Sequence, residues 1–278
     1  MEENVFILSH WQTEQSVFKK NLEVLKDRPD KDAVHDLRVA VKKMRAIVEL
    51  YVRLTEEKLL DNPLQETEQL FKVLGRQRDI EICLDCLDEI NKESGQSFHE
   101  CREFFHFVLK KGQHWTAVAV REFNDKEPGK IKHLLDNERD WLKGDDLVAK
   151  AIHNITHEFT FLQTLYKQPH KLRQELKKIF YWTKLLPGNL PALYFEKELH
   201  RLCDDLGNWQ DRAMFINRVK HFRKDYLPSA YPEYNELKDM LLETSRKNTL
   251  LLRSSLQQTR RLCKKISLAY TEKTNYLS

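Results

Sequence analysis

Apolar residues recur along most of the chain at spacings of three and four, a pattern typical of amphipathic helices that bury one face. The pattern predicts two successive series of helices. The first series covers residues 4–27, 31–54, 56–74, 79–93, 97–123 and 129–143. The second covers residues 145–167, 169–186, 191–206, 211–226 and 233–270. Proline residues fall mostly between these segments, where a missing backbone N–H does least harm. We therefore predict an all-α protein.

Two short motifs occur twice in the same order, once in each series of helices. The first motif, His-x-x-Arg-x-x-x-Lys, runs from His35 to Lys42 and again from His170 to Lys177. The second motif, Leu-Gly-x-x-x-Asp, runs from Leu74 to Asp79 and again from Leu206 to Asp211. The separation between the two copies is nearly the same for both motifs. This agreement indicates an internal duplication.

The duplication predicts how the chain is organised. We expect a single domain with an N-terminal helical repeat of residues 1–125, a connecting segment of residues 126–144 and a C-terminal helical repeat of residues 145–278. The stretch 124–129 is rich in turn residues and is the predicted loop at the boundary. Each repeat would form a helical bundle, and the two bundles would pack with approximate two-fold symmetry.

The first motif helix carries a basic arc that is separate from its apolar arc. At about 100° per residue, Arg38, Lys42 and Arg45 lie beside His35 on one side of the helix. The apolar arc consists of Leu37, Val41, Met44, Val48 and Tyr51.

The second motif helix repeats this division. Its basic arc places Arg173, Lys177 and Lys184 beside His170. The apolar arc consists of Leu172, Leu176, Ile179 and Leu186. One position differs, since Phe180 stands where the first copy has Arg45, and the second copy is less basic at that turn.

A row of cations on one helix face repels itself, by roughly 0.2–0.5 kcal/mol for each like-charged pair one turn apart. Arginine offers a planar fork to phosphate oxygens, lysine a mobile point charge, and histidine a donor that can become charged. A basic face that is present twice at matching positions therefore favours a bound polyanion. The alternative is a solvated face whose cations pair with acidic side chains on neighbouring helices.

The Leu-Gly-x-x-x-Asp motif has a local interpretation. Gly75 and Gly207 could each end a helix in the left-handed conformation, and Asp79 and Asp211 could then cap the next helix. Two further cations of the first copy would lie in the connecting turn, within reach of the same anion. These are Arg76 and Arg78; the second copy has Asn208 and Gln210 at these positions, followed by Arg212.

Together, the paired basic helices, the paired Leu-Gly-x-x-x-Asp motifs and the duplicated helical layout resemble the CHAD family, the conserved-histidine α-helical domain. The resemblance covers residues 4 to 270 and is closer in the first copy, at Val34–Val39 and Leu74–Asp79. It implies two helical bundles around a basic central pore that binds inorganic polyphosphate, and association with polyphosphate granules. The ligand residues carried over by the resemblance are His35, Arg38, Lys42, Arg45, Arg78, His170, Arg173 and Lys177. The helical wheel and the turns add Lys43, Arg76, Lys178, Lys184 and Arg212.

Composition adds limits to this picture. The formal net charge of +4 is small against 47 basic and 43 acidic side chains, so the placement of the basic residues matters more than their number. Five cysteines, with no signal peptide and no apolar run of membrane-spanning length, predict a cytoplasmic protein. The pair Cys83 and Cys86, and the pair His153 and His157, each lack further ligands for a metal. We expect neither a metal nor a cofactor.

The sequence leaves several functions open. The first is non-enzymatic binding of inorganic polyphosphate, or of other polyanions. A processing enzyme for polyphosphate or phosphate esters would need a carboxylate cluster or an activated nucleophile beside the basic face, and the sequence offers none. RNA binding by the same face and a helical adaptor without an anionic ligand are the remaining alternatives.

Overall fold

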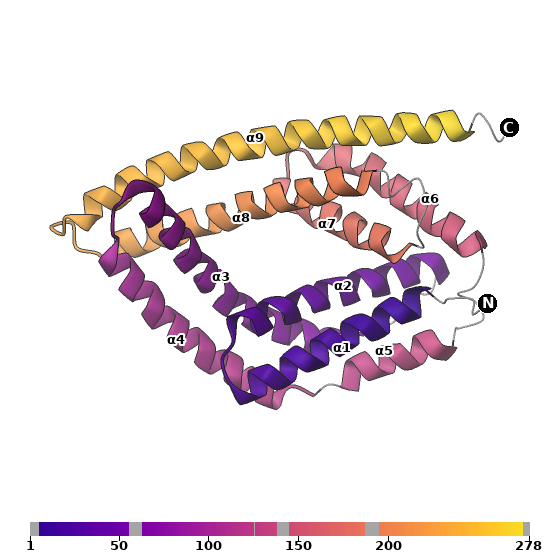
Figure 1. Ribbon diagram of the computed structural model, residues 1–278, viewed down its shortest axis with the longest axis horizontal. Coiled ribbons are helices and arrows are strands. Elements are labelled where there is room, and N and C mark those ends of the chain that lie inside the picture. Colours follow the sequence, from indigo (N-terminus) through magenta and orange to yellow (C-terminus); the bar gives the residue numbers. More distant parts are fainter. Residues whose placement is uncertain (1–5, 56–62, 125, 138–144, 187–194, 275–278) are drawn as a thin grey trace.

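The protein is a bundle of long helices, as the periodicity predicted (Figure 1). The computed structural model describes residues 6–55, 63–124, 126–137, 145–186 and 195–274, and no strand occurs in them. The helices are α1 (Phe6–Asp27), α2 (Lys31–Thr55), α3 (Gln65–Ser94), α4 (His99–Glu122), α5 (Lys126–Asn137), α6 (Asp145–Phe161), η1 (Leu162–Leu165), α7 (Pro169–Leu185), α8 (Glu196–Asp225) and α9 (Glu233–Thr274). The all-α prediction is confirmed. The predicted helix starts at residues 4, 56 and 191 and the predicted end at 143 lie outside the described residues.

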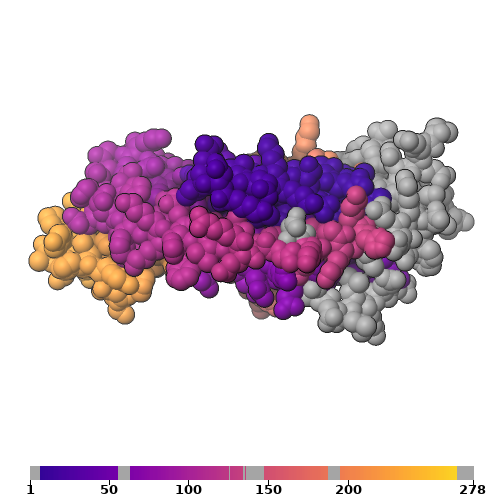
Figure 2. Space-filling view, turned by 90° about the horizontal axis from the view of Figure 1, so that it is seen from below, coloured from indigo at the N-terminus to yellow at the C-terminus, as the bar shows by residue number. Residues whose placement is uncertain are grey.

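The helix pairings of the second half repeat those of the first. Helix α1 packs on α2 and α3 packs on α4, while α6 packs on α7 and α8 packs on α9. The motif helices α2 and α7 contact each other across the two halves, and so do α3 and α8. Helix α5 joins the halves and packs against α1, and Figure 2 shows α1, α4 and α5 side by side on one face.

Two separate apolar cores hold these helices together. The larger core gathers α1, α2, α6 and α7 with the adjoining parts of α3, α8 and α9. The smaller core joins the remaining part of α3 and the first half of α4 to the facing parts of α8 and α9, while Val120 near the end of α4 belongs to the larger core. On α3 the change from one core to the other falls between Leu74 and Ile80, and on α8 between Trp209 and Phe215. The gap on α3 falls within the Leu-Gly-x-x-x-Asp motif, and the gap on α8 begins at the last two residues of that motif.

The predicted helix breaks at Gly75 and Gly207 are wrong, because α3 and α8 each run unbroken through the motif. Among the described glycines only Gly95, at the end of α3, has a positive φ. A Cβ on Gly75 would lie 2.6 Å from Nη1 of Arg38, so this position lacks a side chain to admit a guanidinium. Asp79 and Asp211 accordingly lie inside helices and cap none.

The predicted loop at residues 124–129 is also only partly correct. Helix α5 begins at Lys126, so Pro128 and Gly129 lie in its first turn. Glu127 of this turn accepts the backbone N–H groups of Glu66 and Thr67 at 2.8 and 2.9 Å, and so caps the start of α3. Part of the expected connecting segment is therefore a helix that holds α3 in place.

The remaining sequence expectations concern metals, thiols and membranes. No group of three His, Cys, Asp or Glu side chains within the described ranges could hold a metal ion. All five cysteines are free thiols, and His153 and His157 are exposed on α6. None of the helices, over the residues described, is long and apolar enough to cross a membrane.

Candidate anion-binding site

Cations from the two motif helices, α2 and α7, lie close together. Helices α2 and α7 contact each other, and Trp182 of α7 donates its indole N–H to the carbonyl of Ala46 on α2 at 2.7 Å. Lys42 of α2 lies close enough to Arg173 and Lys177 of α7 for both charges to act on its ammonium group. The basic arcs of the two repeats therefore face a common region.

Lys42 lies at the centre of this cationic cluster. Burial, followed by the charges of Arg38, Arg173 and Lys177, lowers the pKa of its ammonium group from 10.5 to about 8. Asp211 opposes these effects and favours the charged form. In the free protein the cluster is therefore under mutual repulsion, which a bound anion would relieve.

Arg38 is held rigidly at the wall of the cluster. Its Nη1 donates a hydrogen bond to the carbonyl of Phe71 at 2.5 Å, and its Cζ lies 4.0 Å from the centre of the Phe71 ring. The guanidinium fills the space above Gly75. These contacts fix the Arg38 side chain, so that little conformational entropy is lost when it meets a ligand.

Arg173 occupies the equivalent position in the second repeat. Its guanidinium lies beside Gly207, 3.8 Å from the position where a Cβ would stand. The Nε of Arg173 is buried and has no hydrogen-bond partner among the described residues. A buried donor without a partner costs free energy, which an anionic acceptor would recover.

Two carboxylates from the Leu-Gly-x-x-x-Asp motifs lie among these cations. Asp79 faces Arg218 at 3.6 Å and also interacts with Arg38. Asp211 interacts with Arg173, with Lys42 and with Asp79. Burial raises the pKa of both carboxyl groups, and the cations lower it. The two aspartates are thus partial counter-ions of the cluster.

Arg78 joins the cluster from α3 and is oriented by a buried carboxylate. Its Nη1 lies 3.3 Å from Oε2 of Glu81, and the other oxygen of Glu81 accepts the amide N–H of Gln77 at 2.8 Å. Its charge reaches His35, Arg38 and Asp211.

The two histidines of the motif lie at the exposed ends of α2 and α7. Burial, followed by the charge of Arg78, lowers the pKa of His35. His170 packs its ring against Trp209, with 4.8 Å between the ring centres.

A family model of the CHAD domain matches residues 9–220 of the chain. The chain belongs to the CHAD domain family. The match includes both motif helices and both Leu-Gly-x-x-x-Asp motifs, and so covers all the residues of the cationic cluster.

The fold of this CHAD domain agrees with that of a solved relative. The crystal structure of the CHAD domain from the plant Ricinus communis superimposes with a TM-score of 0.74 and 14% sequence identity. The alignment covers 92% of this chain and 90% of the other. At this level of identity the likeness shows the fold. No curated protein matches the sequence.

Two of the predicted ligands of this CHAD domain point away from the cluster. Lys43 pairs with Glu14 of α1 at 2.7 Å, and Lys178 pairs with Glu158 of α6 at 3.0 Å and with Glu175. They occupy matching positions of the two repeats and tie each motif helix to the helix that precedes it. The wheel placed them beside the basic arc, but acidic partners on neighbouring helices draw them to the other side.

The other predicted cations lie at the margins of the cluster. Arg45 pairs with Glu68 at 3.3 Å, and Lys184 pairs with Glu196. Arg76 is exposed on α3, and the charge of Arg212 reaches Cys86 on the facing helix. Lys177 belongs to the cluster but also approaches Asp204 at 3.9 Å. Arg218 was missed from the sequence, because it belongs to neither repeated motif.

Proposed function

We propose that this CHAD domain binds inorganic polyphosphate, without catalysing a reaction, in a basic pore between two pseudo-symmetric helical repeats. The repeats are those expected from the sequence, residues 1–125 and 145–278. The proposed ligands are His35, Arg38, Lys42, Arg78, His170, Arg173 and Lys177. Arg45, Arg76, Lys184 and Arg212 would extend the basic surface at its rim. Lys43 and Lys178 are left out because glutamates hold them elsewhere.

The convergence of both repeats on Lys42 carries this proposal. A largely buried lysine that three neighbouring cations repel lowers the stability of the folded protein. An anion bound beside the lysine would offset this cost. Polyphosphate suits such a site because every phosphate carries charge, so one flexible chain can meet cations from both repeats. Family membership supports the same ligand, since CHAD domains are associated with polyphosphate.

Two features favour polyphosphate over RNA as the ligand of this cluster. Single-stranded RNA gains affinity by stacking its bases on aromatic rings. The Phe71 ring beside the cluster is already covered by Arg38 and, at 5.6 Å, by Arg45. The neighbouring Trp209 ring is buried under His170.

The environment of the carboxylates supports the proposal of binding without catalysis. Asp79 and Asp211 each face guanidinium or ammonium groups, so their charge is already engaged by the protein. The free thiols suit a reducing compartment, and the proposal therefore places binding in the cytoplasm, with polyphosphate granules as the target.

Titration calorimetry with long-chain polyphosphate at two salt concentrations tests this function. Wild-type protein should bind in a salt-sensitive manner, and Lys42→Gln/Lys177→Gln should bind more weakly. Each lost phosphate contact should reduce the slope of log K against log salt by roughly 0.7, by analogy with single strands. Lys110→Gln/Arg121→Gln, which removes two exposed cations from α4, is the matched control and should bind like wild type. Absence of binding by wild type refutes the proposal, and preference for RNA in a competition assay would replace it with the RNA alternative.

A further inference from the structure

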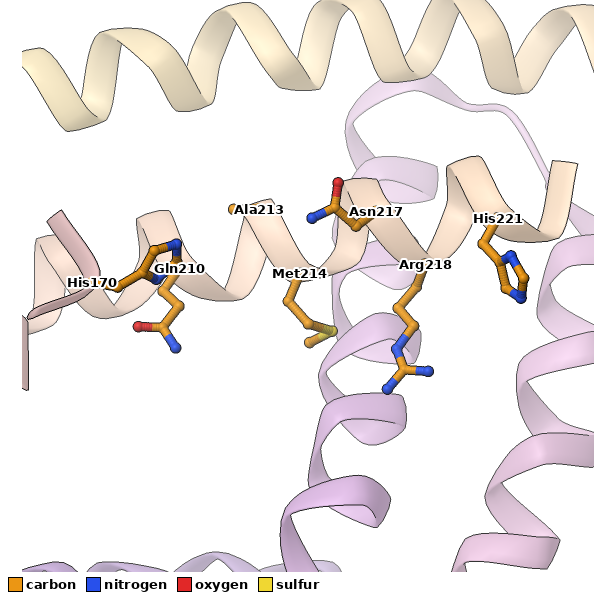
Figure 3. A pocket seen from close by; sticks show the side chains of 7 residues that line it. All are labelled: His170, Gln210, Ala213, Met214, Asn217, Arg218 and His221. Atoms are coloured by element: carbon orange, nitrogen blue, oxygen red, sulfur yellow. The ribbon is translucent and has the colours of Figure 1, made fainter. Parts of the chain in front are cut away.

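A cavity of about 380 Å³ lies next to the proposed polyphosphate site, along α8 (Figure 3). This cavity is open to solvent, and four of its lining residues are exposed: His170, Asn217, Arg218 and His221. His170 lies at one end and His221 at the other, and Gln210, Met214 and Arg218 lie along one side of α8 between them. Asn217 lines the opposite side, together with Ala213. Because Arg218 of this lining pairs with Asp79, which also interacts with Arg38, the cavity adjoins the cationic cluster.

The lining of this cavity differs chemically from the cationic cluster. Gln210 and Asn217 each offer an amide donor and an amide acceptor, whereas phosphate oxygens can only accept. Arg218, the lysine- or arginine-type cation of this lining, already faces Asp79 at 3.6 Å, and His221 faces Asp225 at 2.5 Å. The cavity thus suits an uncharged group with both donors and acceptors rather than more phosphate.

We propose that this cavity holds the nucleoside of a nucleoside oligophosphate, whose phosphate chain passes His170 and ends among the cations of the cluster. The inference rests on the proposed function, because the same cations would hold the phosphates. It adds a class of ligand in which one end of the phosphate chain carries a heterocyclic base.

The side chains at the cavity match a nucleobase in shape and polarity. A single side-chain amide with its donor and acceptor, as on Gln210 or on Asn217, is the group that reads the edge of adenine in proteins. The thioether of Met214, held by the thiol of Cys83 at 3.7 Å, offers a polarisable surface to a ring face. Trp209 supports the His170 ring from behind, at 4.8 Å. The volume is at the small end of the range for ligand pockets, which fits one nucleoside and no strand of bases.

Titration calorimetry can compare two ligands with equal numbers of phosphates, adenosine 5′-tetraphosphate and linear inorganic tetrapolyphosphate, at fixed ionic strength without metal ions. The inorganic chain carries more charge, so electrostatics alone would favour it. We expect adenosine tetraphosphate to bind about tenfold more tightly. Gln210→Leu/Asn217→Leu should abolish this advantage and leave the affinity for tetrapolyphosphate unchanged. Asn208→Leu, an exposed amide on α8 outside the cavity, is the matched control and should retain the advantage.

Three results would overturn the inference. These are equal or tighter binding of tetrapolyphosphate by wild type, an advantage of adenosine that survives in Gln210→Leu/Asn217→Leu, and binding of adenosine alone as tight as that of its tetraphosphate. A parallel titration with long-chain polyphosphate separates the two proposals. If the long chain binds and the adenosine end adds nothing, only the nucleoside inference fails. If the long chain does not bind, the proposed function itself fails.

Discussion

Replacement of Lys42 by methionine should make the free protein more stable while weakening its binding of polyphosphate. Burial and three neighbouring cations lower the pKa of Lys42 from 10.5 to about 8. Each unit corresponds to about 1.4 kcal/mol, so keeping this lysine charged at neutral pH costs the folded state about 3 kcal/mol. Methionine keeps most of the apolar stem and removes the charge. We therefore expect Lys42→Met to raise the free energy of unfolding at pH 7 by about 1–3 kcal/mol.

The size of this effect on stability depends on pH. Below pH 8 both the folded and the unfolded chain carry the proton on Lys42, and the full cost is present. Between pH 8 and 10.5 the folded chain loses this proton while the unfolded chain keeps it, so the wild type gains stability as the pH rises. The stability difference between Lys42→Met and wild type should therefore shrink over that interval.

Urea unfolding followed by far-ultraviolet circular dichroism, at pH 7 and pH 9.5, measures both effects. Lys171→Met, at an exposed position of α7, is the matched control and should change stability little at either pH. A Lys42→Met protein that is less stable than wild type at pH 7, or a stability difference independent of pH, would refute the argument from mutual repulsion. Retention of full polyphosphate affinity would remove Lys42 from the proposed ligands.

Three further predictions separate the roles of neighbouring residues. Gly207→Ala should raise the free energy of unfolding, measured with urea, by about 0.5–1 kcal/mol and leave polyphosphate binding intact. Gly75→Ala should instead displace Arg38 and weaken polyphosphate binding, measured by calorimetry. Equal behaviour of the two variants would contradict the close contact between Gly75 and Arg38. Lys178→Met should lower the free energy of unfolding by about 1–3 kcal/mol and leave polyphosphate affinity unchanged, because Lys178 pairs with glutamates. A loss of affinity in this variant would show that Lys178 is one of the ligands. Asp211→Asn should bind polyphosphate about tenfold more tightly at pH 7. Because burial raises the pKa of Asp211, acidification removes the charge of this carboxylate, and the affinity of the wild type for polyphosphate should rise as the pH falls. Calorimetry over a series of pH values should find a weaker rise in Asp211→Asn.

The parts of the structure that follow from local pattern could be predicted from the sequence. The apolar arc of α2 is buried as the helical wheel required, with Leu37, Val41 and Met44 fully inaccessible to solvent. The same reasoning identified α7, and the repeated motifs gave the resemblance to the CHAD family. These predictions succeeded because burial of one helix face depends mainly on the residues of that helix.

Contacts between distant helices could not be predicted in this way. Lys42 and Lys43 are adjacent in sequence and about 100° apart on the wheel, and the wheel alone does not show which neighbouring helix each one meets. Lys42 lies in the cluster, whereas Lys43 pairs with Glu14 of α1. Gly75 resembles a helix end when only its neighbours in sequence are considered. Its actual role depends on Arg38, which approaches from another helix.

If the cluster binds polyphosphate as proposed, its position explains why both motif helices are needed. Along α3 and α8, the large core ends at Leu74 and Trp209, and the small core begins at Ile80 and Phe215. The intervening turns bury no continuous apolar surface, so polar groups can occupy them without cost to either core. One repeat alone would leave its half of these cations facing water, where a phosphate chain competes with solvent. Pairing of the two repeats would place cations on opposite sides of a partly desolvated space. The same arrangement would increase both the repulsion among these cations in the free protein and their attraction for a polyanion. Stability and affinity are therefore expected to oppose each other at every residue that belongs to the cluster, and to be independent at residues, such as Lys178, that do not.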